Sequence, residues 1–419
     1  MRQGIGCVLA ERGPGSLDEL RHGLEGWRFA CRSVPAAELA GDALASGELL
    51  LLELGGDAPS RIAAAVGAHR AAGGVSLALC DHADAKALSI AATLAVDDVL
   101  LTPVDPVELV RRLQSLAGLA ELVQERRLRD ELFASYLPQQ PRRPEAPELF
   151  AEPPRIALLG GAVGHGVTIL EALPPARISY LDDAIQLDAL AHHEPVRLVI
   201  ITRPDQISPA LDRIEHGMRE GPVLVAAHPG PPLALELPPA VEYLPLPAPM
   251  AVARARLALA LRMAGLRAGL RRPPFGHATG LLLDSLTGLF NQGAFLDYLR
   301  CMTPDRALIG LEIERLEELN AAAGYAAGNR ALARLGRNLA GCVRATDLAG
   351  HLGGGRFAVA VAAANRTQLE RLRCRLEITV AEGEAWNVLA AAESLPAHGA
   401  PAQRLARLFS DLGRLRRAA

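Results

Sequence analysis

Short runs of apolar residues recur through the first two thirds of the chain, and stretches with helical spacing separate them. The runs are IGCVLA, ELLLLEL, VSLALC and VDDVLL in the first 135 residues, then RIALLGG, VRLVIIT, GPVLVAAH and AVEYLPLP in residues 155–272. Short buried strands that alternate with helices form parallel sheets with crossover helices. The sequence therefore predicts two α/β domains, each with a doubly wound parallel sheet.

Pro-rich stretches mark the boundaries within a chain of 419 residues, which is too long for one ordinary core. Domain 1 is predicted over residues 1–137, and its last helix begins at Asp105 and Pro106, a favourable helix start. The predicted linker PQQPRRPEAPELFAEPP covers 138–154, domain 2 covers 155–272 and domain 3 covers 280–417. Domain 3 is predicted to be α+β, in the order helix, strand, long helix, hairpin, helix, strand, helix.

The composition limits the classes of function. A net charge of −3 gives no reason to expect nucleic-acid binding. The six cysteines show no metal or redox spacing, and we find neither a signal peptide nor a run long enough to insert in a membrane. We therefore expect a cytoplasmic protein that reaches the cell pole, if at all, through partners. Lys86 is the only lysine, so motifs that contain arginine will also arise by chance.

Domain 1 resembles the receiver domain of response regulators, which has a flavodoxin-like sheet. In that family an Asp that ends the third strand is phosphorylated, acids near the first strand hold Mg²⁺, and Lys-Pro follows the fifth strand. Here Glu53 stands at the phosphoacceptor position, Glu11 is the remaining first-strand acid, and Thr102 precedes Pro103. The resemblance implies that Glu53 imitates part of the charge of a phosphorylated Asp. The alternative is that Glu53 is a solvated residue at a strand end.

Domain 2 reads as a more eroded version of the same receiver-like fold. Thr202 lies at the strand end that corresponds to Glu53, and no acidic cluster accompanies it. Asp182 and Asp183 are expected in a loop or at a helix start. Since only the packing pattern remains, we predict a dimerisation or adaptor surface.

Domain 3 carries four motifs in order: DSLTGLFNQGAF (284–295), ALIGLEIERLEELNAAAGYAAGNRALARL (307–335), RATD (344–347) and GGGRF (353–357). They resemble the GGDEF domain, the nucleotide-cyclase-like diguanylate cyclase family that condenses two GTP molecules into cyclic di-GMP. Four ordered motifs are far more specific than any one of them alone. The resemblance covers most of residues 280–417.

The residues that the cyclase reaction needs are altered. Phosphoryl transfer requires two metal ions held by oxygen ligands. The resemblance places those ligands at Glu312 and in the turn, where Gly355 and Arg356 replace two acids. A guanidinium repels Mg²⁺ and, being always protonated, cannot act as a base. Asn320 keeps the guanine-reading amide of the family, but Ala321 replaces the neighbouring Asp. We predict no catalysis, no metal site and no cofactor.

Arg344 and Asp347 keep the R-x-x-D motif that forms the family's inhibitory site for cyclic di-GMP. Arg344 can fork onto guanine O6 and N7 or clamp a phosphate, and Asp347 can accept from the guanine N1 and N2 edge. A second arginine usually completes this site, and we expect Arg375 first and Arg371 second. Because Arg127 and Asp130 also fit R-x-x-D, the alternative is a solvated ion pair of little consequence.

The sequence as a whole resembles receiver–receiver–GGDEF proteins and predicts a catalytically inactive receptor for cyclic di-GMP. The resemblance implies a homodimer and protein partners in a polar protease-adaptor complex that acts in the cell cycle, with neither nucleic acid nor membrane insertion. Two alternatives remain open. One is a residual diguanylate cyclase or GTP-binding enzyme, and the other is a dimeric scaffold without a ligand.

Overall fold

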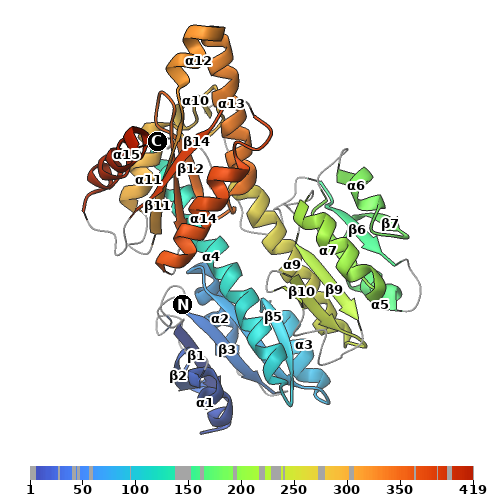
Figure 1. Cartoon of the computed structure of the whole chain (residues 1–419). Helices are drawn as coiled ribbons and strands as arrows, with labels where there is room; N and C mark the ends of the chain where they lie inside the picture. Colours follow the sequence, from blue (N-terminus) through green and yellow to red (C-terminus); the bar gives the residue numbers. More distant parts are fainter. Residues whose placement is uncertain are drawn as a thin grey trace. The chain divides into compact units, whose positions relative to one another are not determined.

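The computed structural model describes residues 6–26, 29–39, 44, 48–55, 60–94, 96–136, 152–160, 165–191, 196–216, 222–227, 237–238, 241–271, 279–301, 306–362, 365–384, 386–393 and 399–418. Most of the predicted linker 138–154 lies outside these residues. The described strands form three sheets (Figure 1). No helix in these ranges combines the length and the apolar character that crossing a membrane requires.

Domain 1 contains a parallel five-stranded sheet in the order β2-β1-β3-β4-β5. This is the strand order of flavodoxin and CheY. The strands are β1 (Gly6–Glu11), β2 (Ala30–Pro35), β3 (Leu49–Leu54), β4 (Val75–Asp81) and β5 (Asp98–Thr102). The helices are α1 (Asp18–Gly26), η1 (Ala36–Glu38), α2 (Ser60–Ala71), α3 (Ala85–Thr93) and α4 (Pro106–Tyr136).

Domain 2 repeats this order from one edge of its sheet to the other, β7-β6-β8-β9-β10, again with parallel strands. The strands are β6 (Arg155–Leu159), β7 (Arg177–Leu181), β8 (Leu198–Ile201), β9 (Val223–Ala227) and β10 (Val241–Pro245). The helices are α5 (His165–Ala172), α6 (Gln186–Ala191), η3 (Pro204–Gln206), α7 (Ile207–His216) and α9 (Met250–Arg271). The two predicted parallel sheets are confirmed, whereas the division into two domains stays a prediction.

Two strands escaped the sequence analysis, β2 and β7, and both are edge strands. Their side chains are mostly half-buried or exposed, whereas those of β4, β6 and β9 are almost all buried. An edge strand covered on few sides does not need a continuous apolar run. The pattern that revealed the central strands is therefore missing at the edges.

Four charged side chains are buried together where α4 and α9 pass the two sheets. Arg112 Nη1 donates to Glu242 Oε2 at 2.8 Å, and Arg256 Nε donates to Asp98 Oδ1 at 3.0 Å. None of these residues is more than 2% exposed. Each arginine belongs to the closing helix of one domain and pairs with an acid in the last strand of the other. The two domains therefore share one buried ion-pair network.

Domain 3 contains an antiparallel four-stranded sheet in the order β12-β13-β11-β14. The strands are β11 (Arg306–Ile313), β12 (Leu348–His351), β13 (Arg356–Ala362) and β14 (Val388–Ala392). The helices are α10 (Thr279–Leu282), α11 (Gln292–Cys301), α12 (Leu316–Ala323), α13 (Tyr325–Cys342), α14 (Arg366–Thr379) and α15 (Pro401–Ala418). The predicted order of elements is confirmed with two differences: the short helix α10 precedes α11, and Gly324, with φ of 79°, breaks the long helix into α12 and α13.

Helices cover both faces of the domain 3 sheet. Side chains of α13 and α14 pack on one face, and those of α11 and α15 pack on the other. The end of α4 also joins the second core, through Leu128, Leu132 and Tyr136. Residues Glu125–Arg142 and Gly269–Ala419 accordingly form one compact unit, and Arg2–Gln124 with Arg143–Ala268 form the other. Helix α4 thus contributes to two cores.

Candidate ligand-binding site and the catalytic positions

The DSLTG motif forms a tight turn that is fastened to the glycine-rich hairpin. Thr287 donates to Asp284 Oδ1 from both its backbone N and its hydroxyl, each at 2.8 Å. Asp284 Oδ2 lies 3.2 Å from His351 Nδ1, and the other ring nitrogen of His351 lies 2.9 Å from the carbonyl oxygen of Gly354. Partial burial opposes ionisation, but the hydrogen bonds from Thr287 and His351 prevail and lower the pKa of Asp284.

The GGGRF hairpin keeps its shape and presents an arginine at the acidic position. Gly353 and Gly354 have φ of 90° and 59°, a backbone conformation that favours glycine. Arg356 begins β13 directly opposite Glu312 of β11, and its guanidinium lies 5.5 Å from the centre of the Phe409 ring. The structure therefore brings these two predicted catalytic positions side by side, with a positive charge where the family has an acid.

Asn320 lies against α13 at Gly328, where any larger residue would clash. A Cβ atom on Gly328 would lie 2.0 Å from Asn320 Oδ1, which is shorter than any normal contact. That oxygen is buried and has no hydrogen-bond partner among the described residues. Gly355 lies against Leu316, since a Cβ there would approach Leu316 Cδ2 to 3.3 Å. Asn320 thus holds an acceptor that is unpartnered in the described part of the chain, with Ala321 as its neighbour, and the assignment of these two positions to a guanine pocket stays a prediction.

The R-x-x-D motif is a closed turn between α13 and β12. Arg344 N donates to Asp347 Oδ2 at 2.9 Å, and Asp347 N donates to the carbonyl oxygen of Arg344 at 3.0 Å. Asp347 is 6% exposed, whereas the side chain of Arg344 is exposed. Burial raises the pKa of Asp347, although the bond from Arg344 and the arginine charges nearby act against this. The arginine therefore faces solvent while the aspartate shapes the turn beneath it.

A second exposed arginine reaches the same turn. Arg375 of α14 donates from Nη2 to the carbonyl oxygen of Cys342 at 3.4 Å, two residues before Arg344. Arg371 is also exposed and precedes Arg375 by four residues, so both lie on one face of α14. By contrast, Arg127 and Asp130 lie inside helix α4, where Asp130 pairs with Arg126 at 2.7 Å. The two R-x-x-D matches therefore differ in their place in the fold: residues 344–347 form a turn, whereas residues 127–130 lie within a helix.

Sequence reasoning missed three arginines that hold the backbone of this turn. Arg129 donates from Nη2 to the carbonyl oxygens of Ala345 and Asp347, each at 3.0 Å. Arg306 donates to Thr346 O at 2.5 Å, and Arg271 donates to Val343 O at 3.4 Å. None of the three belongs to a motif, and no feature of the sequence pointed to them.

In domain 1, the acids at the receiver-like positions are bound by the loop after β1. Glu53 accepts from Arg12 N at 2.9 Å and from the Ser16 hydroxyl, and it is half-buried. Glu11 accepts from Gly15 N at 3.0 Å and from Ser33 Oγ at 2.7 Å. Glu53 is therefore anchored to this loop and not simply solvated, which leaves its role as a charge mimic a prediction.

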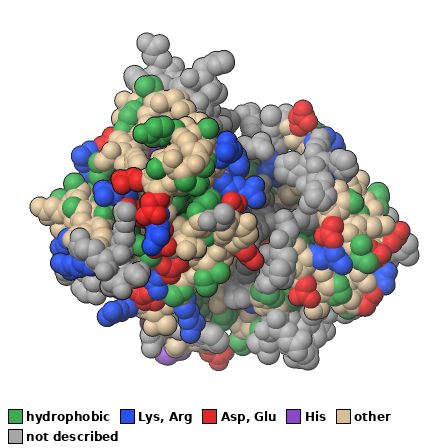
Figure 2. Space-filling view, turned by 45° about the horizontal axis from the view of Figure 1, so that its top comes forward, with side chains coloured by type: hydrophobic (Ala, Val, Ile, Leu, Met, Phe, Trp, Pro, Cys, Tyr) green, Lys and Arg blue, Asp and Glu red, His purple; other side chains and the backbone are tan. Residues whose placement is uncertain are grey.

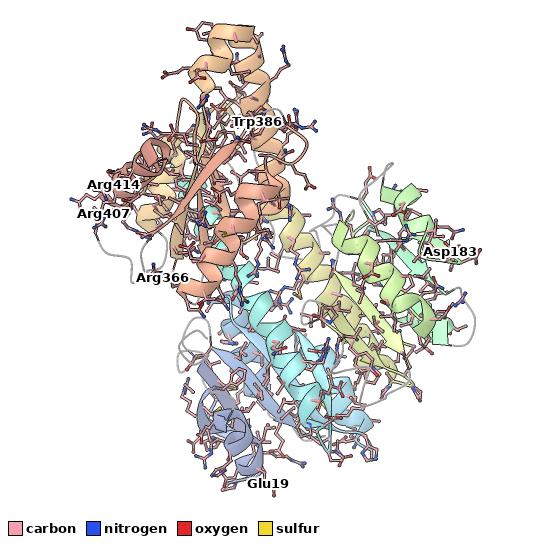
Figure 3. The ribbon with its side chains drawn as sticks, in the orientation of Figure 1. Glu19, Asp183, Arg366, Trp386, Arg407 and Arg414 are labelled. Atoms are coloured by element: carbon pink, nitrogen blue, oxygen red, sulfur yellow. The ribbon has the colours of Figure 1, made fainter. Side chains whose placement is uncertain are left out.

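In domain 2, Thr202 and Asp183 form hydrogen bonds with backbone groups. The Thr202 hydroxyl donates to the carbonyl oxygen of Leu159 at 3.2 Å. Asp183 accepts from Ile185 N at 2.9 Å and from Gln186 N at 3.2 Å, at the start of α6 (Figure 3). The expectation that Asp182 and Asp183 lie in a loop or at a helix start is confirmed.

The last 140 residues thus define an α+β domain in which an arginine-flanked turn precedes a glycine-rich hairpin. Residues 281–389 match the family described as "Diguanylate cyclase, GGDEF domain". This part of the chain is a GGDEF domain, as the motifs predicted.

Several solved structures are similar to this part of the chain. Diguanylate cyclase SiaD of Pseudomonas aeruginosa, solved with its activator SiaC, is 21% identical with a TM-score of 0.30, over 34% of this chain and 61% of that chain. The GGDEF domain of DgcB from Caulobacter crescentus, solved with c-di-GMP, is 20% identical with a TM-score of 0.28. The match covers 33% of this chain and 89% of that chain. A sensory box/GGDEF family protein from Caulobacter crescentus is 25% identical with a TM-score of 0.31. The match covers 33% of this chain and 99% of that chain. This chain therefore spans less than two thirds of the SiaD chain.

The burial of Asp347 leads to a prediction about Asp347→Asn. The folded-state pKa of this carboxyl lies above its ordinary value of 3.8, so its favourable contribution to stability is complete below that value and is lost as the pH rises through the folded-state pKa. An Asn side-chain oxygen can still accept from Arg344 N without a buried charge. We expect the variant to gain on the order of 1 kcal/mol at pH 7 and nothing near pH 4. Urea unfolding at both pH values measures this, and a less stable variant at pH 7 would contradict it.

Proposed function

We propose that the protein is a catalytically inactive GGDEF protein that acts as a receptor for cyclic di-GMP. The observation that carries the proposal is a pair of exposed arginines from different elements: Arg344 in the turn, and Arg375 of α14, which donates to the backbone two residues before it. A flat purine with two acceptors on one edge, joined to phosphates, suits such a pair.

The two arginines divide the recognition of the ligand. One guanidinium can fork onto guanine O6 and N7 while the other clamps a phosphate or stacks on the purine face. Asp347 lies beneath Arg344 and fixes the direction in which it leaves the backbone. A direct contact between Asp347 and the guanine edge stays a prediction. Figure 2 shows basic and acidic side chains interspersed over the face drawn.

The proposed inactivity rests on the chemistry of the catalytic positions. Arg356 stands across from Glu312, where a metal ligand is needed, and its charge opposes a divalent cation. With Mg²⁺ and GTP, we expect chromatography to show no cyclic di-GMP and no GDP above a blank without protein. An active cyclase run in parallel is the positive control. Product that appears with the wild type and disappears in Glu312→Ala would instead support the enzyme alternative.

The cellular role is proposed from resemblance alone. Two receiver-like domains before an altered GGDEF domain resemble the PleD-type cyclases and the cyclic di-GMP effector PopA. By that resemblance, the protein would act as a homodimer that the ligand directs to the cell pole, where it would help deliver a cell-cycle regulator to a protease. Pull-down of the protease adaptor complex with and without cyclic di-GMP tests this role. Capture that is independent of the ligand would contradict it.

Calorimetric titration with cyclic di-GMP is the experiment that decides the receptor proposal. Binding heat at tens of micromolar protein is expected, and GTP or cyclic AMP at the same concentration should give none. If no heat appears with cyclic di-GMP, the receptor proposal fails and the alternative of a scaffold without a ligand gains support.

A further inference from the structure

A buried ionic cluster, Glu125, Arg129, Tyr298 and Arg306, lies directly beneath the R-x-x-D turn. Glu125 and Arg129 are 2% and 4% exposed, and both come from helix α4. Arg129 Nε donates to Glu125 Oε1 at 2.6 Å. Arg306 Nη2 reaches Glu125 Oε2 at 2.5 Å, and the Tyr298 hydroxyl lies 3.0 Å from Oε1. One buried carboxylate thus aligns two guanidinium groups.

The other guanidinium nitrogens of Arg129 donate hydrogen bonds to backbone carbonyl oxygens. Its Nη2 donates to the carbonyl oxygens of Ala345 and Asp347, and its Nη1 donates to that of Leu270 at 2.8 Å. Leu270 lies in the last turn of α9, where helix carbonyls have no intrahelical partner. One side chain therefore joins the end of α9 to the turn that carries Arg344.

The bonds from Arg129 to the carbonyl oxygens of Ala345 and Asp347 determine which side chains of the turn are buried and which are exposed. With these two carbonyls held inward, Asp347 stays buried and Arg344 points outward. Arg306 adds a third inward bond, to Thr346 O. All three residues that follow Arg344 are thus fixed through their backbone by a pair of arginines that Glu125 orients.

We propose that Arg129 is a positioning residue of the ligand site. The position of the α4 segment from Glu125 onward, which carries Arg129, then controls the affinity for cyclic di-GMP. This inference rests on the proposed receptor function. Arg129 does not touch the ligand; it presents Arg344. In metal sites, loss of a residue that orients a ligand costs about 10–100-fold in affinity, and we expect a loss of the same order here. Because coupling is reciprocal, the ligand in turn stabilises this segment of α4.

Arg129→Met and Arg126→Met form a matched pair for the test. Both remove one arginine from α4, but the described partner of Arg126 is Asp130 on the same helix. We expect Arg129→Met to weaken cyclic di-GMP binding in calorimetry at least about tenfold and Arg126→Met to change it less than about twofold. If Arg129→Met does not fold, Arg129→Lys is measured instead, because it keeps the charge beside Glu125 but has no guanidinium fork to hold Leu270, Ala345 and Asp347 together.

Hydrogen exchange without ligand separates positioning from general destabilisation. In Arg129→Met, we expect faster exchange at the amides of Arg344 and Asp347, while the amides of β11 and β13 keep their wild-type rates. Uniformly faster exchange through the domain, or wild-type affinity in a folded Arg129→Met, would overturn the inference. If the wild type binds no cyclic di-GMP, the receptor proposal fails, whereas the exchange rates of the turn still decide whether Arg129 positions it.

Discussion

Arg344→Ala is expected to weaken cyclic di-GMP binding about a hundredfold, which corresponds to roughly 2.7 kcal/mol. The side chain is exposed, so its removal leaves the fold intact, and the backbone N of residue 344 can still donate to Asp347. What is lost is a forked pair of charge-assisted hydrogen bonds, and one bidentate pair is worth about 1–3 kcal/mol. Calorimetry on the wild type and the variant measures the difference directly.

Arg366→Ala is the matched control for this prediction. Arg366 begins α14 and is exposed, so the substitution removes the same charge from the same domain (Figure 3). It lies nine residues before Arg375, which is about 13 Å along a helix, beyond the Debye length at physiological salt. Affinity within about twofold of the wild type is expected for the control. Wild-type affinity in Arg344→Ala would show that the turn does not bind the ligand.

The arginines of α14 extend the test. Arg375→Ala should cost about tenfold, because its guanidinium already lies at the turn through the bond to Cys342 O. Arg371 lies one helical turn away and has no described bond to residues 342–347, so its substitution should cost less. If substitution of Arg371 weakens binding more than substitution of Arg375, the second ligand contact is Arg371.

The parts of this fold that could be predicted from the sequence are those whose burial is complete. β3, β4, β8 and β9 are apolar over almost their whole length, so a run of hydrophobic residues identifies each. β2 and β7 lie at sheet edges, where no residue of β2 and only Leu181 of β7 is buried, so neither strand shows a continuous apolar run. The helix break at Gly324 was equally hidden, because apolar spacing continues on both sides of it.

Recognition of the candidate site from sequence followed the same rule of locality. The turn from Arg344 to Asp347 closes on itself within four residues, so its motif is visible in the sequence. The glycines at 353 and 354 also act locally, through the positive φ that the hairpin requires. Arg129 contacts Ala345 across 216 positions of sequence, and one more arginine in an arginine-rich chain carries no signal. Distant residues that support a site emerge only from the folded structure.

Arg256→Met is expected to destabilise the unit that holds the two parallel sheets by about 3–5 kcal/mol. Arg256 is fully buried and donates to Asp98 Oδ1 at 3.0 Å and to Tyr243 O at 2.5 Å. Without it, the Asp98 carboxylate, which is 0% exposed, keeps the hydrogen bond from Val99 N, and among the described residues its one remaining charged partner is Arg112 at 3.7 Å. A buried charge that loses its partner cannot recover the solvation it gave up, so the cost far exceeds that of a surface pair.

Two further variants determine whether the lost charge partner causes that cost. Arg254→Met removes an exposed arginine two positions earlier in α9 and should shift stability by less than about 0.5 kcal/mol. Asp98→Asn/Arg256→Met removes both charges, keeps an acceptor for Val99 N, and should recover about half of the loss or more. Urea midpoints of the four proteins measure all three differences. If the double variant is no more stable than Arg256→Met, the packing of the arginine and not its charge holds the two sheets together.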